Sequence, residues 1–352
     1  MDLTGWLLRR AVPRPFVVTT VGGTGARLAV ERIVRERGWR RALSPADADL
    51  LVVCGPANAD ADEALDRVWA QLPGPRARAR VGAPEQARHA LDTARADLLD
   101  VAAQRRDADA RDRSARAAAD PDEDMPGGLP MAGRGEDRDG LTLDRLHLSL
   151  GPALPDWPAG LSLRTVIQGD VVQEAHVSLV GARDGAASFW GAPDGDRGGR
   201  STAAALDSAQ RLLSVAGWPA AALSARRLRD ALLEPGPRPG TGAELRRWRH
   251  MVGRSRLLRW SLRGLGRVGD GAPEELRGDA ADRWARWLGR IGTASDPGPP
   301  GAAPGGPDVA RTALDLLPDL VVGQELASAR LVVASLDPDT EAVGAYAPEP
   351  GT

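Results

Sequence analysis

In the first hundred residues, short apolar runs typical of strands alternate with segments whose apolar residues have helical spacing. Ala48–Cys54 reads ADLLVVC, a run that is apolar apart from Asp49 and is typical of a strand buried on both faces. The predicted elements are strands at 16–21, 48–54 and 79–84 and helices at 26–37 and 63–71. This alternation predicts an α/β module over residues 1–101, with a small parallel sheet and flanking helices.

Residues 102–140 have a different pattern, first charged and then rich in proline and glycine. They contain hardly any large apolar residues, so they bury too little surface to offset the entropy of ordering. We predict a flexible linker here, whose first half could extend a surface helix. The acids at 120–124 lack the spacing and terminal glutamate of an EF-hand, which favours a solvated segment over a calcium loop.

The remaining residues, 141–352, predict a second module of the α+β class. Two strand-like runs flank Gln168–Gly169–Asp170, a usable hairpin turn, and the period then becomes helical. The predicted parts are a β-hairpin at 146–181, a mainly helical bundle at 201–292, a flexible linker at 295–308, and a C-terminal helix and strand at 309–340.

Composition narrows the function classes. The chain has 352 residues, enough for two domains, and its net charge of −2 gives no global field that selects nucleic acid. Its single cysteine, Cys54, cannot supply a disulfide framework, a cysteine-rich zinc site or the ligand set of an iron–sulfur cluster. No signal peptide and no apolar run of ~20 residues is present, so we expect a cytoplasmic protein without a transmembrane span.

A glycine-rich turn between the first strand and the first helix resembles a phosphate-binding loop. The stretch VGGTGARLA has the strand-to-helix context of an anion site at a helix N-terminus. Asp47 and Asp49 lie about twenty residues further on, where a ribose-binding acid would sit. The loop matches neither the P-loop motif GxxxxGK[ST] nor the dinucleotide-binding motif GxGxxG cleanly. All 46 basic residues are arginine, so the chain has no lysine to contact a phosphate. A tight structural turn is the simpler interpretation.

Histidines give little support for a catalytic or metal site. The four of them are scattered, without the spacing of a zinc site and without the nucleophile elbow of a serine hydrolase. His147 and His176 fall in strand-like segments, where we expect them to be partly buried.

Eight arginines between Arg246 and Arg267 mark the strongest local charge. An amphipathic helix pair with a solvated face would explain them. A docking surface for an acidic partner or for anionic headgroups is the functional alternative. RNA binding would require more interleaved aromatics and a net basic domain. The candidate docking residues are Arg246, Arg247, Trp248, Arg249, Arg256, Trp260 and Arg263.

The segment Ala48–Pro75 resembles the iron–sulfur small subunit (20-kDa type) of respiratory complex I and of membrane-bound nickel–iron hydrogenases. The family pattern is an Ala-Asp pair opening a buried strand that ends at glycine, a helix with Leu, Arg and an aromatic residue, and a Gln-apolar-Pro-x-Pro ending. The matching residues are Ala48, Asp49, Gly55, Leu65, Arg67, Trp69, Gln71, Pro73 and Pro75.

The second module is similar to the partner large subunit (49-kDa type) of the same assemblies. Leu146–Ala175 resembles the start of that subunit, where a Gly-Pro turn leads into a β-hairpin. Leu331–Asp339 resembles its C-terminal Ser-x-Asp-Pro-Cys segment. The resemblance therefore implies a fusion of a small-subunit-like module with a shortened large-subunit-like module.

The departures from this family concern its redox centres. Gly22, Gly23, Thr24 and Gly25 stand in the cysteine-bearing cluster loop, and Pro84 stands where a further cluster cysteine would fall. Asp339 and Ala342 stand where hydrogenases have their C-terminal cysteine pair. Ala153–Pro155 replaces the neighbourhood of a quinone-site histidine. The resemblance thus implies a degenerate subunit with no cofactor and no catalytic residue.

Together these observations predict a non-catalytic peripheral subunit, a pseudoenzyme, on the cytoplasmic face of the membrane. Its partners would be membrane-embedded complex I-like or antiporter-like subunits that move protons or ions. One alternative is a subunit of an active NADH or quinone oxidoreductase complex whose redox centres lie on other chains. Another is a regulator that binds a nucleotide or anion at Gly22–Gly25. We expect neither nucleic acid nor a small-molecule ligand.

Overall fold

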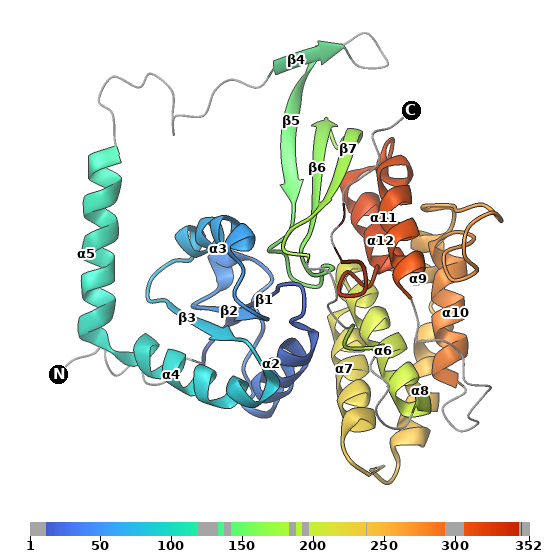
Figure 1. The fold of residues 1–352 in the computed structure, drawn as a ribbon, viewed down its shortest axis with the longest axis horizontal. Helices are drawn as coiled ribbons and strands as arrows, with labels where there is room; N and C mark the ends of the chain where they lie inside the picture. Colours follow the sequence, from blue (N-terminus) through green and yellow to red (C-terminus); the bar gives the residue numbers. More distant parts are fainter. Residues whose placement is uncertain are drawn as a thin grey trace. The chain divides into compact units, whose positions relative to one another are not determined.

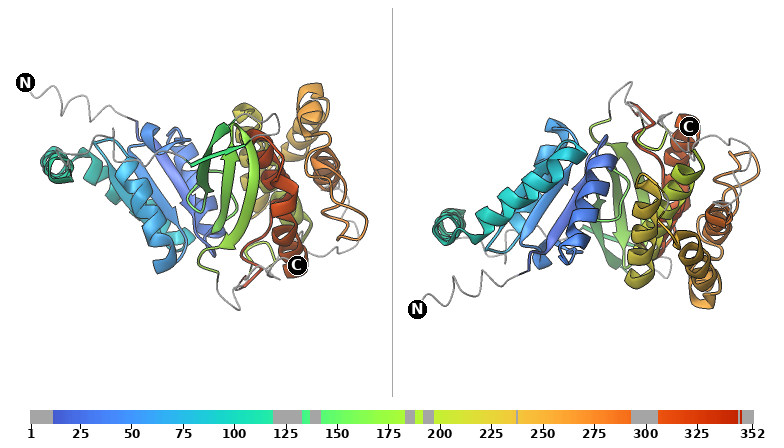
Figure 2. Two further views of the ribbon diagram at one scale, coloured as in Figure 1. Left: turned by 90° about the horizontal axis from the view of Figure 1, so that it is seen from above. Right: turned by 90° about the horizontal axis from the view of Figure 1, so that it is seen from below.

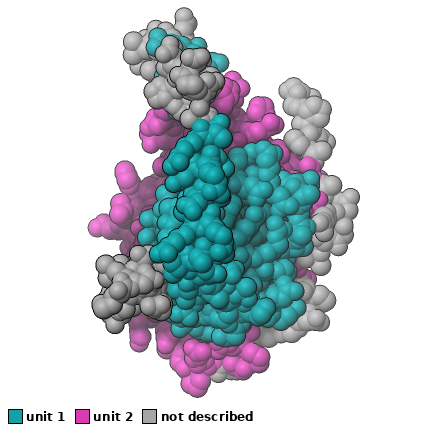
Figure 3. Space-filling model, turned by 90° about the vertical axis from the view of Figure 1, so that its left-hand side faces the viewer, with its two compact units in different colours: residues 1–146 teal, residues 147–352 magenta. Residues whose placement is uncertain are grey.

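The computed structural model describes residues 12–118, 133–136, 142–182, 188–191, 197–236, 238–292, 306–344 and 346. The chain divides into two compact units, residues 1–146 and residues 147–352 (Figure 3). The two units have separate hydrophobic cores, and each is described by itself below.

Three short parallel strands form the centre of the first unit (Figure 1). They lie in the order β1-β2-β3, with bounds Pro15–Thr19 for β1, Leu50–Cys54 for β2 and Ala77–Val81 for β3. β2 is buried along its whole length, as expected for the central strand of a covered parallel layer. The register aligns Thr19, Cys54 and Val81, so all three strands end at the same edge of the sheet.

Helices cover the sheet of the first unit. α2 (Thr24–Glu36) and α4 (Ala87–Leu99) pack against the strand side chains of one face, and α3 (Ala59–Gln71) lies on the other side (Figure 1). Two short 3-10 helices, η1 (Pro45–Asp47) and η2 (Pro84–Gln86), precede β2 and α4. The predicted α/β class of this module is therefore present.

The segment predicted as a flexible linker, residues 102–140, contains a helix in its first half, which the prediction allowed, and a short strand, which it did not. Residues Val101–Ala118 form the 18-residue helix α5, and Gly133–Glu136 form strand β4. α5 is rich in alanine and arginine, which favour helix even without an apolar stripe. It is also held at one end, because Gln104 Oε1 accepts a hydrogen bond from the Arg76 backbone N–H at 2.8 Å. Residues 119–132 and 137–141, with the predicted acidic cluster, lie outside the described residues.

A second, antiparallel sheet contains the predicted hairpin. Its order is β4-β5-β6-β7, where β5 is Thr142–Leu150, β6 is Leu161–Gln168 and β7 is Val171–Leu179. The turn between β6 and β7 is at Gly169, whose φ of 64° is a conformation that favours glycine. The register shifts between Val166 and Ile167, whose partners are Glu174 and Val172, so the extra residue of this irregularity is Gln173 of β7.

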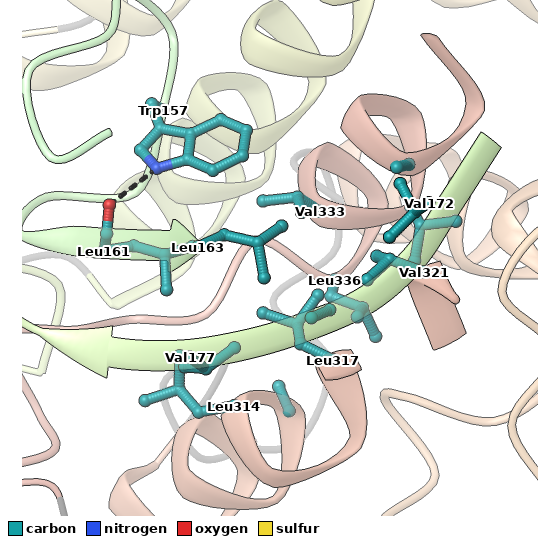
Figure 4. Packing of buried hydrophobic residues seen from close by; sticks show 14 of the residues in the cluster. Trp157, Leu161, Leu163, Val172, Val177, Leu314, Leu317, Val321, Val333 and Leu336 are labelled. Carbon is teal, nitrogen blue, oxygen red and sulfur yellow. Dashed lines mark hydrogen bonds between the residues drawn. The ribbon is translucent and has the colours of Figure 1, made fainter. Parts of the chain in front are cut away.

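Two helices cover one side of this hairpin. α11 (Pro307–Val321) and α12 (Leu326–Leu336) pack on β6 and β7 (Figures 1 and 2). Figure 4 shows Leu163 and Val177 of the hairpin beside Leu314, Leu317 and Val333 of the two helices. At the edge of this core the Trp157 indole N–H donates to the Leu161 carbonyl at 2.8 Å.

Five further helices form a second core in the same unit. They are α6 (Arg197–Val215), α7 (Pro219–Leu233), α8 (Thr241–Gly253), α9 (Arg256–Leu262) and α10 (Ala280–Gly292). Within the bundle predicted at 201–292, the arginine-rich stretch is divided after Gly253 into α8 and α9. Ser255 begins α9 there, because its Oγ accepts a hydrogen bond from the Leu258 N–H at 3.2 Å.

The prediction of a C-terminal strand is wrong. Residues Leu326–Leu336 form α12, since the buried side chains of Ala329, Val332, Val333 and Leu336 follow helical rather than alternating spacing. Asp337 ends the helix in a left-handed conformation with φ of 39°. The preceding helix spans Pro307–Val321, so it begins inside the linker predicted at 295–308, and residues 293–305 lie outside the described residues.

Candidate functional site

The glycine loop of the first unit lies at the edge where the three parallel strands end. Thr20 follows β1, and its backbone N–H and its Oγ1 both donate to the Cys54 carbonyl, at 2.9 and 3.2 Å. The Gly23 N–H donates to the Thr20 carbonyl at 2.9 Å, and Gly22 has a φ of 83°. The loop is therefore a tight turn fixed to the end of β2.

Glycine is required in this turn by close backbone packing. A Cβ atom on Gly23 would lie 2.2 Å from the Cys54 carbonyl oxygen, and one on Gly55 would lie 2.3 Å from Thr20 Oγ1. No side chain fits at either position without moving the backbone. The segments that follow the C-terminal ends of β1 and β2 are thus packed directly against each other.

Pro84 is brought to the same edge of the sheet. It opens η2, which follows β3 and contacts α2. Gln86 Oε1 closes this second turn by accepting from the N–H groups of Gly82 and Ala83, at 3.0 and 3.3 Å. The positions that the resemblance marks as cluster-cysteine positions, Gly22–Gly25 and Pro84, therefore share one end of the sheet.

The residues at this edge do not fit an iron–sulfur cluster. Clusters are held by thiolates, and the chain's one thiol, Cys54, is a β2 core residue with no exposed surface. Burial raises the pKa of Cys54 to about 12, so the thiolate that a cluster requires is disfavoured. The nearest hydroxyl, Thr20 Oγ1, is occupied in bonding the backbone.

The acids proposed for a dinucleotide site lie at the opposite edge of the sheet. Asp47 and Asp49 precede β2, whereas the glycine loop lies where the strands end. Asp49 Oδ1 accepts from the Arg14 backbone N–H at 2.7 Å, and Asp47 pairs with the Arg14 side chain at 3.1 Å. The carboxyl end of β2, where a ribose-binding acid belongs, is Cys54 and Gly55. This arrangement contradicts the ribose-binding role for both acids.

In the second unit, Asp339 lies in a half-buried polar cluster after α12. The Ser188 hydroxyl donates to Asp339 Oδ2 at 2.5 Å, and Glu341 Oε2 accepts from the Phe189 N–H at 3.0 Å. Burial raises the pKa of Asp339 to about 6, and the negative charge of Glu341 acts in the same direction. Ala342 completes the turn through its N–H to the Asp339 carbonyl at 3.0 Å. Asp339 and Ala342 thus stabilise the turn that follows α12.

An arginine–carboxylate network lies beside this turn and joins three helices. Arg229 of α7 donates to Asp207 of α6 at 2.6 Å and to the neighbouring Asp230 at 2.8 Å. Arg211 of α6 bonds Asp207 at 2.6 Å and also bonds Asp337 at the end of α12. Because every charge in this group has an opposite charge in contact, its role in the fold is structural.

Metal-ligand geometry is not found in the described residues. No group of three or more histidine, cysteine, aspartate or glutamate side chains among them is arranged to hold a metal ion. His147 and His176 are exposed, which corrects the expectation that they are partly buried.

The candidate docking residues divide into buried and exposed members. Trp248 belongs to the helical core, where it is 4% exposed and its indole N–H donates to the Ala221 carbonyl at 3.0 Å. It is therefore not available to a partner, which corrects its assignment to the docking surface. The exposed members are Arg246, Arg247, Arg249, Arg256, Trp260 and Arg263.

Sequence reasoning missed two exposed members of this region, Leu257 and Arg259. The signal was the helical phase of α9: Leu258 and Leu262 are four residues apart and face the core, so Leu257 and Arg259 must face outward. Leu257 is 75% exposed and Trp260 is 76% exposed.

Charge in this region is uncompensated. Residues 245–269, here called the basic segment, contain eight arginines and no aspartate or glutamate. Arg267 lies 3.6 Å from Asp279, and the other seven form no ion pair with any carboxylate of the described residues. None of the described helices is long and apolar enough to cross a membrane.

Comparisons with known proteins give a distant structural likeness. No protein-family model and no curated protein sequence matches the chain. Among solved structures, it is similar to a chain of the membrane-bound sulfane sulfur reductase (MBS), an archaeal respiratory membrane complex. The two share 14% sequence identity with a TM-score of 0.39, over 56% of this chain and 98% of that chain.

Proposed function

We propose that the chain is a non-catalytic peripheral subunit of a complex I-like or hydrogenase-like membrane assembly. Its partners are membrane-embedded subunits that translocate protons or ions, and it acts on the cytoplasmic face. The family-like segments Ala48–Pro75 and Leu146–Ala175 motivate the proposal, one in each half of the chain.

One observation carries the non-catalytic part of the proposal. The edge that would hold a cluster in the small-subunit family is closed by Thr20, Gly23 and the end of β2, with no thiol facing it. In the second unit the position of the metal-binding cysteines is Asp339, which is bonded to Ser188. Both positions are used to hold turns, which fits a subunit that keeps the fold of a redox protein for assembly.

The exposed part of the basic segment supports a docking role. Seven of its eight arginines form no ion pair with a carboxylate of the described residues, so an anionic surface can pair with these seven without breaking existing ion pairs. The buried side of the same helices is fully used in the core, through Leu245, Trp248 and Leu258. The segment is thus folded onto the core before any partner binds, which lowers the entropy cost of binding.

Affinity purification of the tagged full chain from its native membranes in a mild detergent tests this function. We expect integral membrane subunits to co-purify in stoichiometric amounts, as identified by mass spectrometry, and the chain itself to contain no iron or acid-labile sulfide. An untagged strain is the control. Recovery of the chain alone would contradict the assembly role, and stoichiometric iron in the chain would contradict the non-catalytic role. Iron–sulfur subunits among the partners would favour the alternative of an active oxidoreductase complex.

A further inference from the structure

The two most exposed large apolar side chains among the described residues are neighbours on one short helix. Leu257 and Trp260 are three residues apart on α9, so they lie on adjacent turns of the same side. Opposite them, Leu258 and Leu262 are 5% and 0% exposed and fix the helix to the core. The outward direction of Leu257 and Trp260 is therefore set by the packing of α9.

Three arginines surround these apolar side chains. Arg256 and Arg263 lie four residues before and three residues after Trp260, and Arg259 precedes it directly. All three are exposed, and none forms an ion pair within the described part of the chain. We call Arg256, Leu257, Arg259, Trp260 and Arg263 the α9 surface.

We propose that the α9 surface binds anionic phospholipid at the membrane, with Leu257 and Trp260 entering the interfacial layer and the three arginines contacting headgroup phosphates. Tryptophan is favoured at the membrane interface, where one end of the ring is wet and the other apolar. Arginine suits the neighbouring positions, because its long stem packs on apolar groups while its guanidinium reaches phosphate oxygens. The inference rests on the proposed function and deepens it, because it adds anionic lipid to the membrane subunits as a partner of this chain.

The size of the surface favours lipid over an acidic protein. α9 has seven residues and is therefore about 10 Å long, whereas a stable protein interface buries roughly 800 Å² on each partner. A lipid headgroup layer needs no matched geometry, and a few arginines with two apolar side chains are enough for reversible binding. Single-stranded nucleic acid would use several aromatic platforms along a groove, and this helix presents one tryptophan.

Vesicle co-sedimentation of the full chain tests the inference directly. The probe is vesicles of phosphatidylcholine with and without about one-third phosphatidylglycerol. We expect binding to the anionic vesicles, weak binding to the neutral ones, and a marked loss of binding when the salt concentration is raised. Failure to bind anionic vesicles at low salt would overturn the proposal, as would equal binding to both compositions.

Substitutions separate the charged from the apolar contribution. Neutralising the arginines in the triple variant R256Q/R259Q/R263Q should lower the partition coefficient about 100-fold, at roughly fivefold for each arginine near an anionic surface. The double variant L257S/W260S keeps every charge and should lower binding at least tenfold. The matched control is R105Q/R106Q/R113Q on exposed positions of α5, which removes the same charge and should bind as the wild type does. Retained binding in the α9 triple variant would overturn the proposal.

Two soluble competitors test whether the α9 surface prefers lipid to an acidic polypeptide or to RNA. Soluble polyglutamate and a short single-stranded RNA are added to the vesicle assay at equal charge concentration. We expect neither to bind the isolated chain with an affinity comparable to that of the anionic vesicles. Tighter binding of either one through the α9 arginines would contradict the lipid assignment. Vesicles contain no protein subunits, so a negative vesicle result together with co-purified membrane subunits would refute this inference alone and leave the proposed function standing.

Discussion

Asp207 and Arg229 form an ion pair inside the second unit, with 2.6 Å between Asp207 Oδ1 and Arg229 Nη1. Both side chains are 1% exposed or less. Their pairing joins α6 to α7, and Arg211 extends it to Asp337 at the end of α12. A buried pair of this kind adds little net stability by itself, but removing one partner leaves a buried charge without compensation.

We therefore expect Arg229→Ala to lower the free energy of unfolding by about 3 to 5 kcal/mol. Arg227→Ala is the matched control, because it lies on the same helix with an exposed side chain, and its effect should stay within about 0.5 kcal/mol. Urea unfolding followed by circular dichroism measures both. Equal stability of the two variants would mean that the network is not a structural element of the fold.

The pH dependence of stability should report the half-buried carboxyl of Asp339. Burial raises its pKa from 3.8 to about 6, so the folded chain holds this proton more tightly than the unfolded chain does. Folding then takes up a proton between about pH 4 and pH 6, and the free energy of unfolding falls as the pH rises through that window. Asp339→Asn removes the titration while keeping an oxygen that accepts from Ser188.

The difference in stability between Asp339→Asn and the wild type should consequently shift in favour of the variant by roughly 2 to 3 kcal/mol between pH 4 and pH 7.5. Other titrating groups cancel in this difference. Asp319→Asn on the exposed side of α11 serves as the control, and its curve should run parallel to the wild type. A parallel curve for Asp339→Asn as well would show that the half-buried cluster does not hold the proton.

Two tryptophans of the basic segment should respond in opposite ways. Trp248→Ala should lower the free energy of unfolding by about 3 to 5 kcal/mol, because it opens a cavity in the core and removes the hydrogen bond to Ala221. Trp260→Ala should change it by less than about 0.5 kcal/mol, since that side chain is 76% exposed. Comparable losses in the two variants would contradict the finding that Trp248 lies in the core and that Trp260 is exposed to solvent.

The closed edge of the parallel sheet makes a steric prediction. Gly23→Ala would place a Cβ 2.2 Å from the Cys54 carbonyl oxygen, so we expect a loss of about 2 kcal/mol or more in the free energy of unfolding. Gly289→Ala is a comparison with open space around the new Cβ, and on the exposed side of α10 it should be neutral or stabilising by up to about 1 kcal/mol. Denaturant unfolding of both variants measures the difference. A fully stable Gly23→Ala variant would show that the edge has room for a side chain and would weaken the case against a site there.

Much of the parallel layer and the hairpin could be predicted from local pattern. The strand predicted at Ala48–Cys54 contains β2, Leu50–Cys54, and the Gly169 turn lies between β6 and β7. α5 was foreseen only as a possible helix extension, because the segment lacks an apolar stripe, whereas its helix-forming residues and the contact of Gln104 with Arg76 are independent of burial. α12 was missed because Val332 and Val333 suggested a strand, whereas their spacing to Ala329 and Leu336 is helical.

The candidate site was less predictable, because it depends on contacts between distant segments. The stripe of Leu245, Trp248 and Val252 could have placed Trp248 in the core from sequence. Nothing local indicates that Arg229 is buried, since its partner Asp207 lies 22 residues away and its burial follows from the packing of α6 on α7. The predicted strand at 48–54 already placed Asp47 and Asp49 at its start, and the structure confirms that they lie at the wrong edge for a ribose.

The native mass of the particle that contains this chain tests the central claim most directly. The tagged full chain is extracted from its own membranes with a mild detergent, and its complex is weighed by native mass spectrometry. We predict a particle well above the 37.1 kDa of the chain, with integral membrane subunits that dissociate from it as identifiable masses. A particle of 37.1 kDa, or an oligomer of this chain alone, would contradict the account of the protein as a peripheral subunit of a membrane assembly.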